Sequence, residues 1–467
     1  MPNPISSSAA SDSPPRSVHI VSLGCPKNRV DTELMVGRLV EAGFTPTANA
    51  EGADLLLVNT CAFIEASKEE SVEAIIDLAD VKARNPGTRL VVAGCLAQRH
   101  APELRAELPE VDFFIGTGEY QGLAELLDLA PAAALNLPAA LGERKPRPQY
   151  VADHLAPRYV AEGTFSNWLK IAEGCSQGCS FCIIPKLRGV QRSRTVDDLV
   201  AEARSLVERG ALELNLIAQD LTHYGIELGQ PEALATLVRA LGHVDGLRWV
   251  RLMYAYPDNI SDALLAAMAE TDNCLPYLDI PLQHAADSVL KRMNRIGDRR
   301  AIEDVLRRLR GAIPDVAIRT TLLVGHPGEG EAEFQQLCDF VREQRFAHMG
   351  CFAWSSEEGT LSARMADTVP TLVRRHRQQQ IMAIQRQIAA ENSAARVGQR
   401  VEVLVEGLSE ETDLLLQGRA TWQAPEIDGL IYINDAPDDI GRGQLRQVEI
   451  SATAGEYDLV GHVVDGV

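Results

Sequence analysis

The first part of the chain alternates short apolar runs with stretches of helical periodicity. The predicted elements are strands at 18–23, 54–60 and 89–94, and helices at 31–42, at 69–81 and from Ala101 onward. This β-α-β-α-β-α order is typical of a parallel sheet covered by helices. We therefore predict a parallel α/β domain over 18–130. Residues 1–17 are rich in Ser, Pro and Ala, and we expect them to form a disordered tail.

The middle of the chain repeats the same alternation six times. Strands are predicted at 168–173, 213–218, 249–255, 277–282, 317–325 and 348–354, with helical patterns between them. Six β-α units over 161–395 predict an incomplete parallel barrel, (β/α)6, whose chemistry would lie at the carboxyl ends of the strands. Between the two α/β regions, 131–160 is rich in Ala, Pro and charged residues, which is typical of a linker.

The last segment, 396–467, has the pattern of a third domain. Alternating apolar and polar residues, interrupted by Gly, Pro and Asp, predict a small antiparallel β-barrel. The segment contains five Arg and no Lys against fourteen Asp and Glu, so its net charge is −9. A surface that binds nucleic-acid phosphates depends on Lys and Arg, and this domain has few of them.

Composition restricts the class of protein. The apolar content of 46% is that of a globular protein, and no apolar run approaches the roughly 20 residues of a membrane span. We therefore predict no membrane association. The net charge of −20 argues against broad nucleic-acid binding. Nine cysteines without a secretion signal predict metal ligands in a reducing, cytoplasmic compartment rather than disulfides.

Three cysteines of the first domain share one position. Cys25, Cys61 and Cys95 each lie at the carboxyl end of a predicted strand. Parallel strands place these ends along one edge of the sheet, where open α/β sheets build their sites. The three thiols could therefore meet in space and hold a metal cluster with an open iron. Three unrelated cysteines remain the alternative, because short apolar runs are ambiguous.

A second group of thiols is contiguous in sequence. Cys175, Cys179 and Cys182 have a C-x3-C-x2-C spacing, and no Cys or His occurs in the next forty residues. Structural zinc sites and iron–sulfur clusters normally take four protein ligands, so three thiolates would leave one metal position open for catalysis. Three ordinary buried cysteines are the alternative. The remaining cysteines are predicted to be packing residues; these are Cys274, Cys338 and Cys351.

Polar residues follow the predicted barrel strands. They are Gln219, Asp220, Tyr256, Gln283, His284, His326 and Glu329. We interpret His284 and His326 as hydrogen-bonded wall residues rather than metal ligands. Three arginines after the cysteine loop could either steer a carboxylate or remain solvated; these are Arg188, Arg192 and Arg194.

The cysteine loop, with Phe181 before its last cysteine, resembles the cluster loop of radical S-adenosylmethionine enzymes. From Val18 onward the chain resembles the methylthiotransferase family, which joins a three-cysteine domain, a radical S-adenosylmethionine barrel and a TRAM domain. This resemblance implies two 4Fe–4S clusters, one on each cysteine triplet, and no catalytic side chain beyond their ligands. It implies S-adenosylmethionine both as methyl donor and as radical source, with Phe181, Gln219 and Gln283 binding it. Sulfur would enter at the open iron of the first cluster.

Several stretches resemble the branch of this family that modifies an aspartate in the twelfth small-subunit ribosomal protein. They are 23–28, 182–185, 281–284, 424–429 and 456–459. The implied partners are that basic protein, free or within the ribosomal subunit, a low-potential electron donor and a sulfur donor. An acidic terminal domain suits a basic protein, so no direct tRNA binding is expected.

Two alternatives stay open at this point. One is the branch that modifies adenosine in tRNA, which shares all six cysteines, and the other is a non-enzymatic iron–sulfur sensor. The chain also departs from the family pattern at His326, where an aromatic residue is usual, and at Gly330, where Thr is usual. Both departures concern the shape of the S-adenosylmethionine pocket rather than the metal ligands.

Overall fold

The computed structural model describes residues 16–128, 147–410, 412, 414–435, 437 and 439–464. The predicted tail at 1–17 lies outside these ranges except for its last two residues, and so does most of the predicted linker. Contacts divide the chain into two compact units. The first comprises residues 1–148 with 157–159, and the second comprises 149–156 with 160–467. Of the helices in the described ranges, none is both long enough and apolar enough to cross a membrane.

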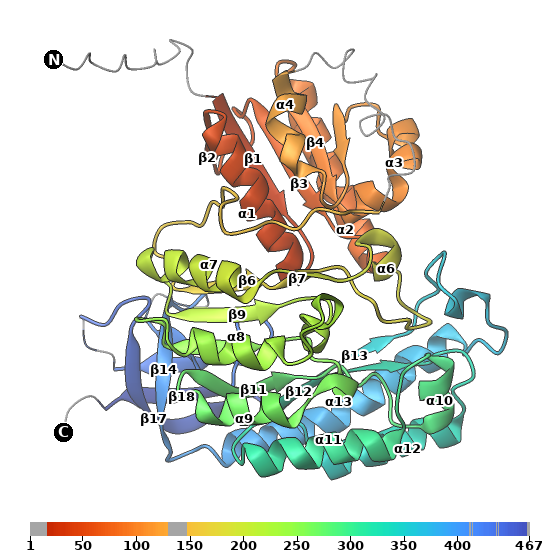
Figure 1. Ribbon diagram of the computed structural model, residues 1–467, viewed down its shortest axis with the longest axis vertical. Coiled ribbons are helices and arrows are strands. Elements are labelled where there is room, and N and C mark those ends of the chain that lie inside the picture. Colours follow the sequence, from red (N-terminus) through yellow and green to blue (C-terminus); the bar gives the residue numbers. More distant parts are fainter. Residues whose placement is uncertain are drawn as a thin grey trace. The chain divides into compact units, whose positions relative to one another are not determined.

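The first unit contains a five-stranded parallel sheet with helices packed on it (Figure 1). Its strand order is β2-β1-β3-β4-β5. The strands are β1 (Arg16–Ser22), β2 (Phe44–Thr47), β3 (Leu55–Thr60), β4 (Arg89–Gly94) and β5 (Phe113–Ile115). The helices are α1 (Pro26–Glu41), α2 (Glu65–Arg84), α3 (Cys95–Glu107), the short 3-10 helix η1 (Tyr120–Gly122) and α4 (Leu123–Asp128). The predicted parallel α/β fold is confirmed.

Helix α1 begins five residues earlier than the apolar pattern predicts. Pro26 occupies the first helical turn, where its missing N–H costs nothing, and Cys25 is the N-cap. The first two turns bury polar residues, including Asn28 and Asp31, so they show no apolar periodicity. Strands β2 and β5 were not predicted, because runs of four and three residues are too short to be distinguished from loops.

The second unit begins with a six-stranded parallel sheet in the order β13-β12-β11-β10-β9-β6. Its strands are β6 (Ser166–Lys170), β9 (Glu213–Ile217), β10 (Trp249–Leu252), β11 (Cys274–Asp279), β12 (Ala317–Val324) and β13 (His348–Ala353). A small hairpin is formed by β7 (Ala172–Glu173) and β8 (Arg192–Ser193). All six predicted barrel strands are present, and all are parallel.

Amphipathic helices cover this sheet. They are α6 (Ile184–Leu187), α7 (Val196–Glu208), α8 (Ala233–Leu241), α9 (Asp262–Glu270), α10 (Asp287–Arg292), α11 (Arg299–Ala312), α12 (Glu331–Gln344) and α13 (Thr371–Ala394). Short 3-10 helices are η2 (Leu221–His223), η3 (Ile226–Leu228), η4 (Pro257–Asn259) and η5 (Ser362–Arg364). Helix α11 shows why they form. Asp298 caps its first turn by accepting from the Ala301 amide at 2.8 Å, and Ile302, Leu306 and Leu309 make one buried stripe.

The C-terminal part of the second unit is a closed five-stranded barrel. Its order is β14-β15-β16-β18-β17, with β14 (Arg400–Leu408), β15 (Leu416–Ala420), β16 (Ile431–Asn434), β17 (Leu445–Ala454) and β18 (Asp458–Val463). Alternate residues such as Val403 and Val405 fill its interior. The predicted small β-barrel is confirmed, and its strand pairs are antiparallel except for β16 and β18, which pair in parallel. The loop and strand between them reverse the chain twice, and sequence alternation carries no information on direction.

This small barrel joins the amino-terminal side of the six-stranded sheet through buried charges. Glu213, at the start of β9, accepts from Arg251 at 3.1 Å and from Arg419 of β15 at 2.7 Å. Burial alone would raise the pKa of Glu213, but Arg419 and Arg251 outweigh it and lower the pKa to about 2. Asp428 likewise accepts from Tyr277 of β11 at 2.9 Å and pairs with Arg319 of β12 at 2.5 Å. The carboxyl ends of the sheet strands are thereby left for the cysteine loop.

Candidate functional site

The cysteine loop of the second unit leaves β7 at Glu173 and ends at α6. Gly174 has a φ of +82°, and a Cβ there would lie 2.3 Å from the carbonyl oxygen of Val190. Only glycine allows this close approach without strain. The Cys175 amide then donates to the Gly189 carbonyl at 3.0 Å. The loop is therefore folded back on itself.

The three thiols of this loop lie in a desolvated environment. Cys175 is buried, and Cys179 and Cys182 are partly buried. Burial raises the pKa of Cys175 and of Cys182 to about 12, and the charge of Cys179 adds to the rise in both. Thiolates in such a place need a compensating positive charge, which metal ligation supplies.

The donor set fits an iron–sulfur cluster. Among the described residues, no three Cys, His, Asp or Glu side chains are grouped as ligands of a metal ion would be. The thiolates of a four-iron cluster bind different irons, so they need not meet at one point. Three soft thiolates on a glycine-dependent loop are the ligand type that such clusters take.

A buried ion-pair network lies directly before the loop. Glu173 accepts from Lys170 at 2.8 Å and from Arg188 at 3.0 Å. Burial would raise the pKa of Glu173, but Arg188 and Lys170 hold it well below its usual range. The expectations for two arginines are corrected here, because Arg188 is bound to Glu173 and Arg194 to Asp198 and Glu202. Both are therefore structural ion-pair partners, neither solvated nor available to steer a substrate carboxylate.

The three residues expected to bind S-adenosylmethionine lie around the carboxyl ends of the strands. Gln219, after β9, donates to Glu173 at 3.0 Å, while its buried side-chain oxygen has no hydrogen-bond partner. Gln283, after β11, has a φ of +71°, a conformation that costs a non-glycine residue on the order of 1–3 kcal/mol. Phe181 packs its ring edge-to-face against His326 at 6.4 Å. An unsatisfied acceptor and backbone strain are features that cluster at functional sites.

The two histidines are hydrogen-bonded wall residues, as predicted. His284 is fully buried, and its Nδ1 accepts from the Ala286 amide at 3.0 Å. His326 Nε2 lies 3.2 Å from the Ser180 hydroxyl, and its Nδ1 lies 3.2 Å from the Pro327 carbonyl. Burial lowers the pKa of His326 to about 4, so the ring is neutral at physiological pH.

In the first unit, the three candidate thiols end neighbouring strands. Cys25, Cys61 and Cys95 follow β1, β3 and β4, which are adjacent in the sheet. Asn28 ties these ends together, because its side-chain amide donates to the carbonyls of Leu23 and Thr60, both at 2.9 Å. The Cys95 thiol lies 3.9 Å from the Asn28 side-chain oxygen.

Gly24 brings two of these loops into contact. A Cβ at Gly24, which has a φ of +88°, would lie 2.8 Å from the Cys61 Cβ. The residue before Cys25 therefore packs directly against Cys61. The predicted arrangement of strand ends is present in the sheet, because each of the three thiols follows one of three adjacent strands.

Sequence reasoning missed three polar residues beside these loops. Asn28 is only the last residue of the stretch 23–28, Glu173 only the end of the predicted strand 168–173, and Arg295 belongs to no motif. Arg295 Nη1 lies 3.9 Å from the Cys179 thiol although the two residues are 116 positions apart. Asn28 could have been singled out in the sequence as a polar residue within a short motif. Nothing in the local sequence indicates the contact of Arg295.

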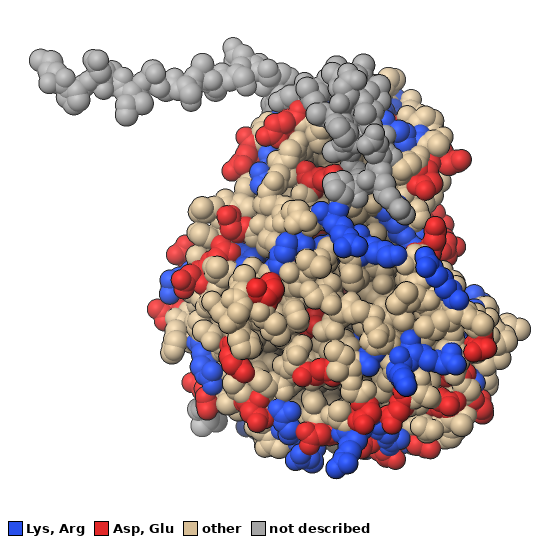
Figure 2. Space-filling model, turned by 45° about the vertical axis from the view of Figure 1, so that its right-hand side comes forward, with Lys and Arg blue, Asp and Glu red and all other residues tan. Residues whose placement is uncertain are grey.

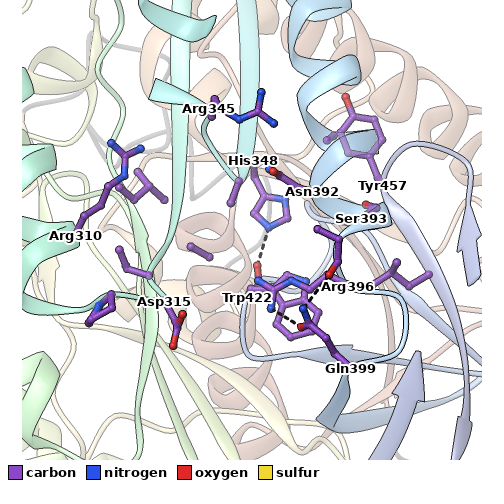
Figure 3. Close-up of a pocket in the computed structure, with 18 residues that line it drawn as sticks. Arg310, Asp315, Arg345, His348, Asn392, Ser393, Arg396, Gln399, Trp422 and Tyr457 are labelled. Carbon is purple, nitrogen blue, oxygen red and sulfur yellow. Dashed lines mark hydrogen bonds between the residues drawn. The ribbon is translucent and has the colours of Figure 1, made fainter. Parts of the chain in front are cut away.

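A cavity of about 430 Å³ lies elsewhere in the second unit, where the six-stranded sheet meets the small barrel (Figure 3). It is lined from α11, α13 and the small barrel, at the end of the sheet away from the cysteine loop. Its arginines do not converge. Arg310 binds Gln344, Arg345 binds Glu391, and Arg396 stacks on Trp422 at 4.0 Å. This cavity is a junction between the two barrels rather than the candidate site.

Three family models match successive parts of the chain. Residues 17–116 match the uncharacterized protein family UPF0004, 169–341 match the radical SAM superfamily, and 397–464 match the TRAM domain. The middle match contains Cys175, Cys179 and Cys182, and the first contains the other candidate thiols. The order of the matches is the order of the folds described above.

Solved structures share the fold at low sequence identity. A radical S-adenosylmethionine methyltransferase, TsrM from Kitasatospora setae, solved with cobalamin and a 4Fe–4S cluster, matches with a TM-score of 0.54 and 13% identity over 72% of this chain and 75% of that one. The cobalamin-dependent S-adenosylmethionine radical enzyme OxsB matches with a TM-score of 0.53 and 12% identity over 79% of this chain and 56% of that one. These likenesses concern the fold alone.

Curated relatives match almost the whole chain. A ribosomal protein uS12 methylthiotransferase RimO from Anaeromyxobacter sp. (strain K) is 52% identical over 96% of this chain and 93% of its own length. The protein of that name from Geobacter sulfurreducens is 44% identical over 96% of this chain and 98% of its own length. At this identity and coverage, the chain belongs to the RimO family of methylthiotransferases, radical S-adenosylmethionine enzymes with a TRAM domain.

Proposed function

We propose that this protein adds a methylthio group to the β carbon of an aspartate in ribosomal protein uS12. The near-full-length likeness to uS12 methylthiotransferases carries this proposal. Six cysteines support it, three on one loop and three after adjacent strands, because one cluster could generate the radical and the other could deliver sulfur. An aspartate β carbon has no acidic proton for a general base, so a hydrogen atom must be removed instead.

The reaction balances as follows. The C–H bond of the aspartate breaks, and its hydrogen leaves with the 5′-deoxyadenosyl part of one S-adenosylmethionine. One electron from a low-potential donor would start the reductive cleavage of that S-adenosylmethionine, and methionine leaves. The C–S bond would form between the substrate radical and sulfide-level sulfur from a separate donor, and this step returns one electron. The methyl group on that sulfur comes from a second S-adenosylmethionine, which leaves as S-adenosylhomocysteine. When bound, the radical cluster supplies that reductive cleavage, which is cofactor chemistry that the protein orients and shields.

The chain's own residues would hold and orient these groups. Cys175, Cys179 and Cys182 would ligate the radical cluster, and Cys25, Cys61 and Cys95 the second one. The unsatisfied oxygen of Gln219 is an acceptor available to a cationic ligand such as S-adenosylmethionine. The side-chain amide of Gln219 donates to Glu173, which fixes its orientation. Glu173 is itself held by ion pairs with Lys170 and Arg188. We propose that Gln283 and Phe181, which border the same end of the barrel, also bind S-adenosylmethionine.

The substrate assignment agrees with the charge of the terminal domain. The segment 396–467 has a net charge of −9, which favours a basic ribosomal protein over tRNA. Such a substrate places the protein in the cytoplasm. We expect binding to uS12 to weaken as salt rises to physiological strength, where the screening length is about 8 Å.

One experiment tests both the chemistry and the substrate. Anaerobically reconstituted protein is given S-adenosylmethionine, a reductant, a sulfur source and either uS12 or unmodified tRNA. We expect 5′-deoxyadenosine and a methylthiolated uS12 peptide by mass spectrometry. Cys175→Ala, Cys179→Ala and Cys182→Ala should each abolish 5′-deoxyadenosine, whereas Cys338→Ala should not. Methylthiolated adenosine in tRNA, without modified uS12, would contradict the assignment.

A further inference from the structure

Arg295 is brought to the cysteine loop by the segment after α10. The Ser180 amide donates to the Met293 carbonyl at 2.8 Å, and the Asn294 side chain donates to the Gly178 carbonyl at 2.7 Å. Asn294 itself has a φ of +54°. Two hydrogen bonds and a strained residue therefore fix this segment against the loop that contains the three thiols.

The guanidinium of Arg295 is held on three sides. One nitrogen donates to the Pro281 carbonyl at 2.7 Å, and another lies 3.9 Å from the Cys179 Sγ, within reach of an N–H···S hydrogen bond. Its central carbon lies 3.9 Å from the centre of the Tyr256 ring. The planar fork of Arg matches this geometry, because separate N–H groups reach the carbonyl and the sulfur.

The charge of Arg295 is not neutralised by an ion pair. Within the described part of the chain, no carboxylate forms a salt bridge with it. A partly buried cation that lies 3.9 Å from the Cys179 thiol, without a salt bridge to a described carboxylate, acts on the charge of a cluster held by that thiol.

We propose that Arg295 sets the reduction potential of the cluster held by Cys175, Cys179 and Cys182. The inference rests on the proposed function, because it requires a redox-active cluster on this loop. Reduction adds a negative charge to a cluster. A fixed cation and an N–H···S hydrogen bond favour the reduced form, and hydrogen bonds to sulfur are among the factors that set cluster potentials. Arg295 is therefore a positioning residue that eases the first electron transfer without touching the substrate.

The test measures potential rather than turnover. Arg295→Gln and Arg295→Lys are made in a Cys25→Ala, Cys61→Ala, Cys95→Ala background, so that one cluster remains, and each is titrated anaerobically by EPR. We expect at least a tenfold lower ratio of reduced to oxidised cluster at a fixed potential for Arg295→Gln. For a one-electron couple that corresponds to about 59 mV. Arg295→Lys should fall between Arg295→Gln and the parent, because it keeps the charge and loses the fork.

Arg292→Gln is the matched control. It removes the same charge three residues earlier, at the end of α10, where the Arg292 guanidinium faces the exposed Asp367 at 3.5 Å instead of a cysteine. Its potential should equal that of the parent. Unchanged potentials in an Arg295 variant that binds iron normally would overturn the inference. If Arg295→Gln loses iron, Arg295→Lys decides by the same measurement. Absence of iron from the parent protein would instead contradict the proposed function itself.

Discussion

At the scale of single residues, the candidate site depends on a few positions that tolerate one residue type. Gly174 is one of these, because a positive φ and a close carbonyl coincide there. Arg295 is another, because its guanidinium bonds to a carbonyl and approaches a thiol together. Gln283 accepts backbone strain at a strand end where ordinary packing would not require it. Substitution at such positions should affect the cluster loop before it affects the fold.

Gly174→Ala should displace the cysteine loop. The new Cβ would meet the Val190 carbonyl at 2.3 Å, so the loop must move. Gly163→Ala is the matched control, since its φ of +74° carries the same backbone penalty of about 1 kcal/mol while nothing lies within 4 Å. We expect Gly174→Ala to lose iron from the radical cluster at nearly unchanged circular dichroism, and Gly163→Ala to keep it. Equal iron in both variants would contradict this account of the loop.

At the scale of secondary-structure elements, both candidate sites are built where parallel strands end. β1, β3 and β4 each deliver one cysteine, and the side chain of Asn28 joins the ends of β1 and β3. The barrel delivers its cysteines on one loop and its glutamines from separate strands. The first arrangement depends on sheet order, whereas the second depends mainly on local sequence.

The triple variant Cys25→Ala, Cys61→Ala, Cys95→Ala should separate the two sites functionally. These thiols follow three strands of the first unit, and the radical loop lies in the second unit. We expect iron content to fall to about half, by the four-iron count per cluster. Cleavage of S-adenosylmethionine should persist while methylthiolated product disappears. The control is the triple variant of the packing cysteines, Cys274→Ala, Cys338→Ala, Cys351→Ala, which should keep full iron. Full iron in the first variant would show that its cysteines are not ligands.

At the scale of the whole molecule, charge has two separate roles. The net charge of −20 is distributed, and acidic and basic side chains alternate over the lower part of the face shown in Figure 2. One network of buried charges lies between the six-stranded sheet and the small barrel, where Glu213 joins Arg251 to Arg419. The surface charge affects which partners bind, and the buried charge affects whether the terminal barrel stays packed against the six-stranded sheet.

Glu213→Gln should loosen the terminal barrel. Removing the carboxylate leaves the buried Arg251 without a carboxylate partner and Arg419 with Glu406 alone, which costs about 3–5 kcal/mol of unfolding free energy. Glu449→Gln, in the exposed pair with Arg400 at 2.9 Å, should cost about 0–1 kcal/mol. Chemical unfolding of the two variants measures the difference. Equal losses would show that the buried network does not stabilise the junction.

The stability that Glu213 contributes is also expected to depend on pH. The folded pKa of Glu213 is about 2, below its ordinary value of 4.5, so the unfolded chain binds the proton first. The stabilisation is therefore fully present above pH 4.5 and is lost as pH falls towards 2. We expect the stability difference between wild type and Glu213→Gln to shrink across that interval. A difference independent of pH would exclude Glu213 ionisation as its cause.

The sequence by itself determined the three folds and both cysteine sets. Apolar runs of five or more residues predicted the strands of the two parallel sheets except β2 and β5. Thiols after strands or at C-x3-C-x2-C spacing indicated the candidate ligands, because these signals are local. The tertiary structure decided what depends on distant residues. It paired Arg188 with Glu173, placed β18 parallel to β16, buried Glu213 against Arg419 and brought Arg295 to Cys179. Such contacts arise from chain reversals and from the need to neutralise buried charge, neither of which leaves a periodic trace in the sequence.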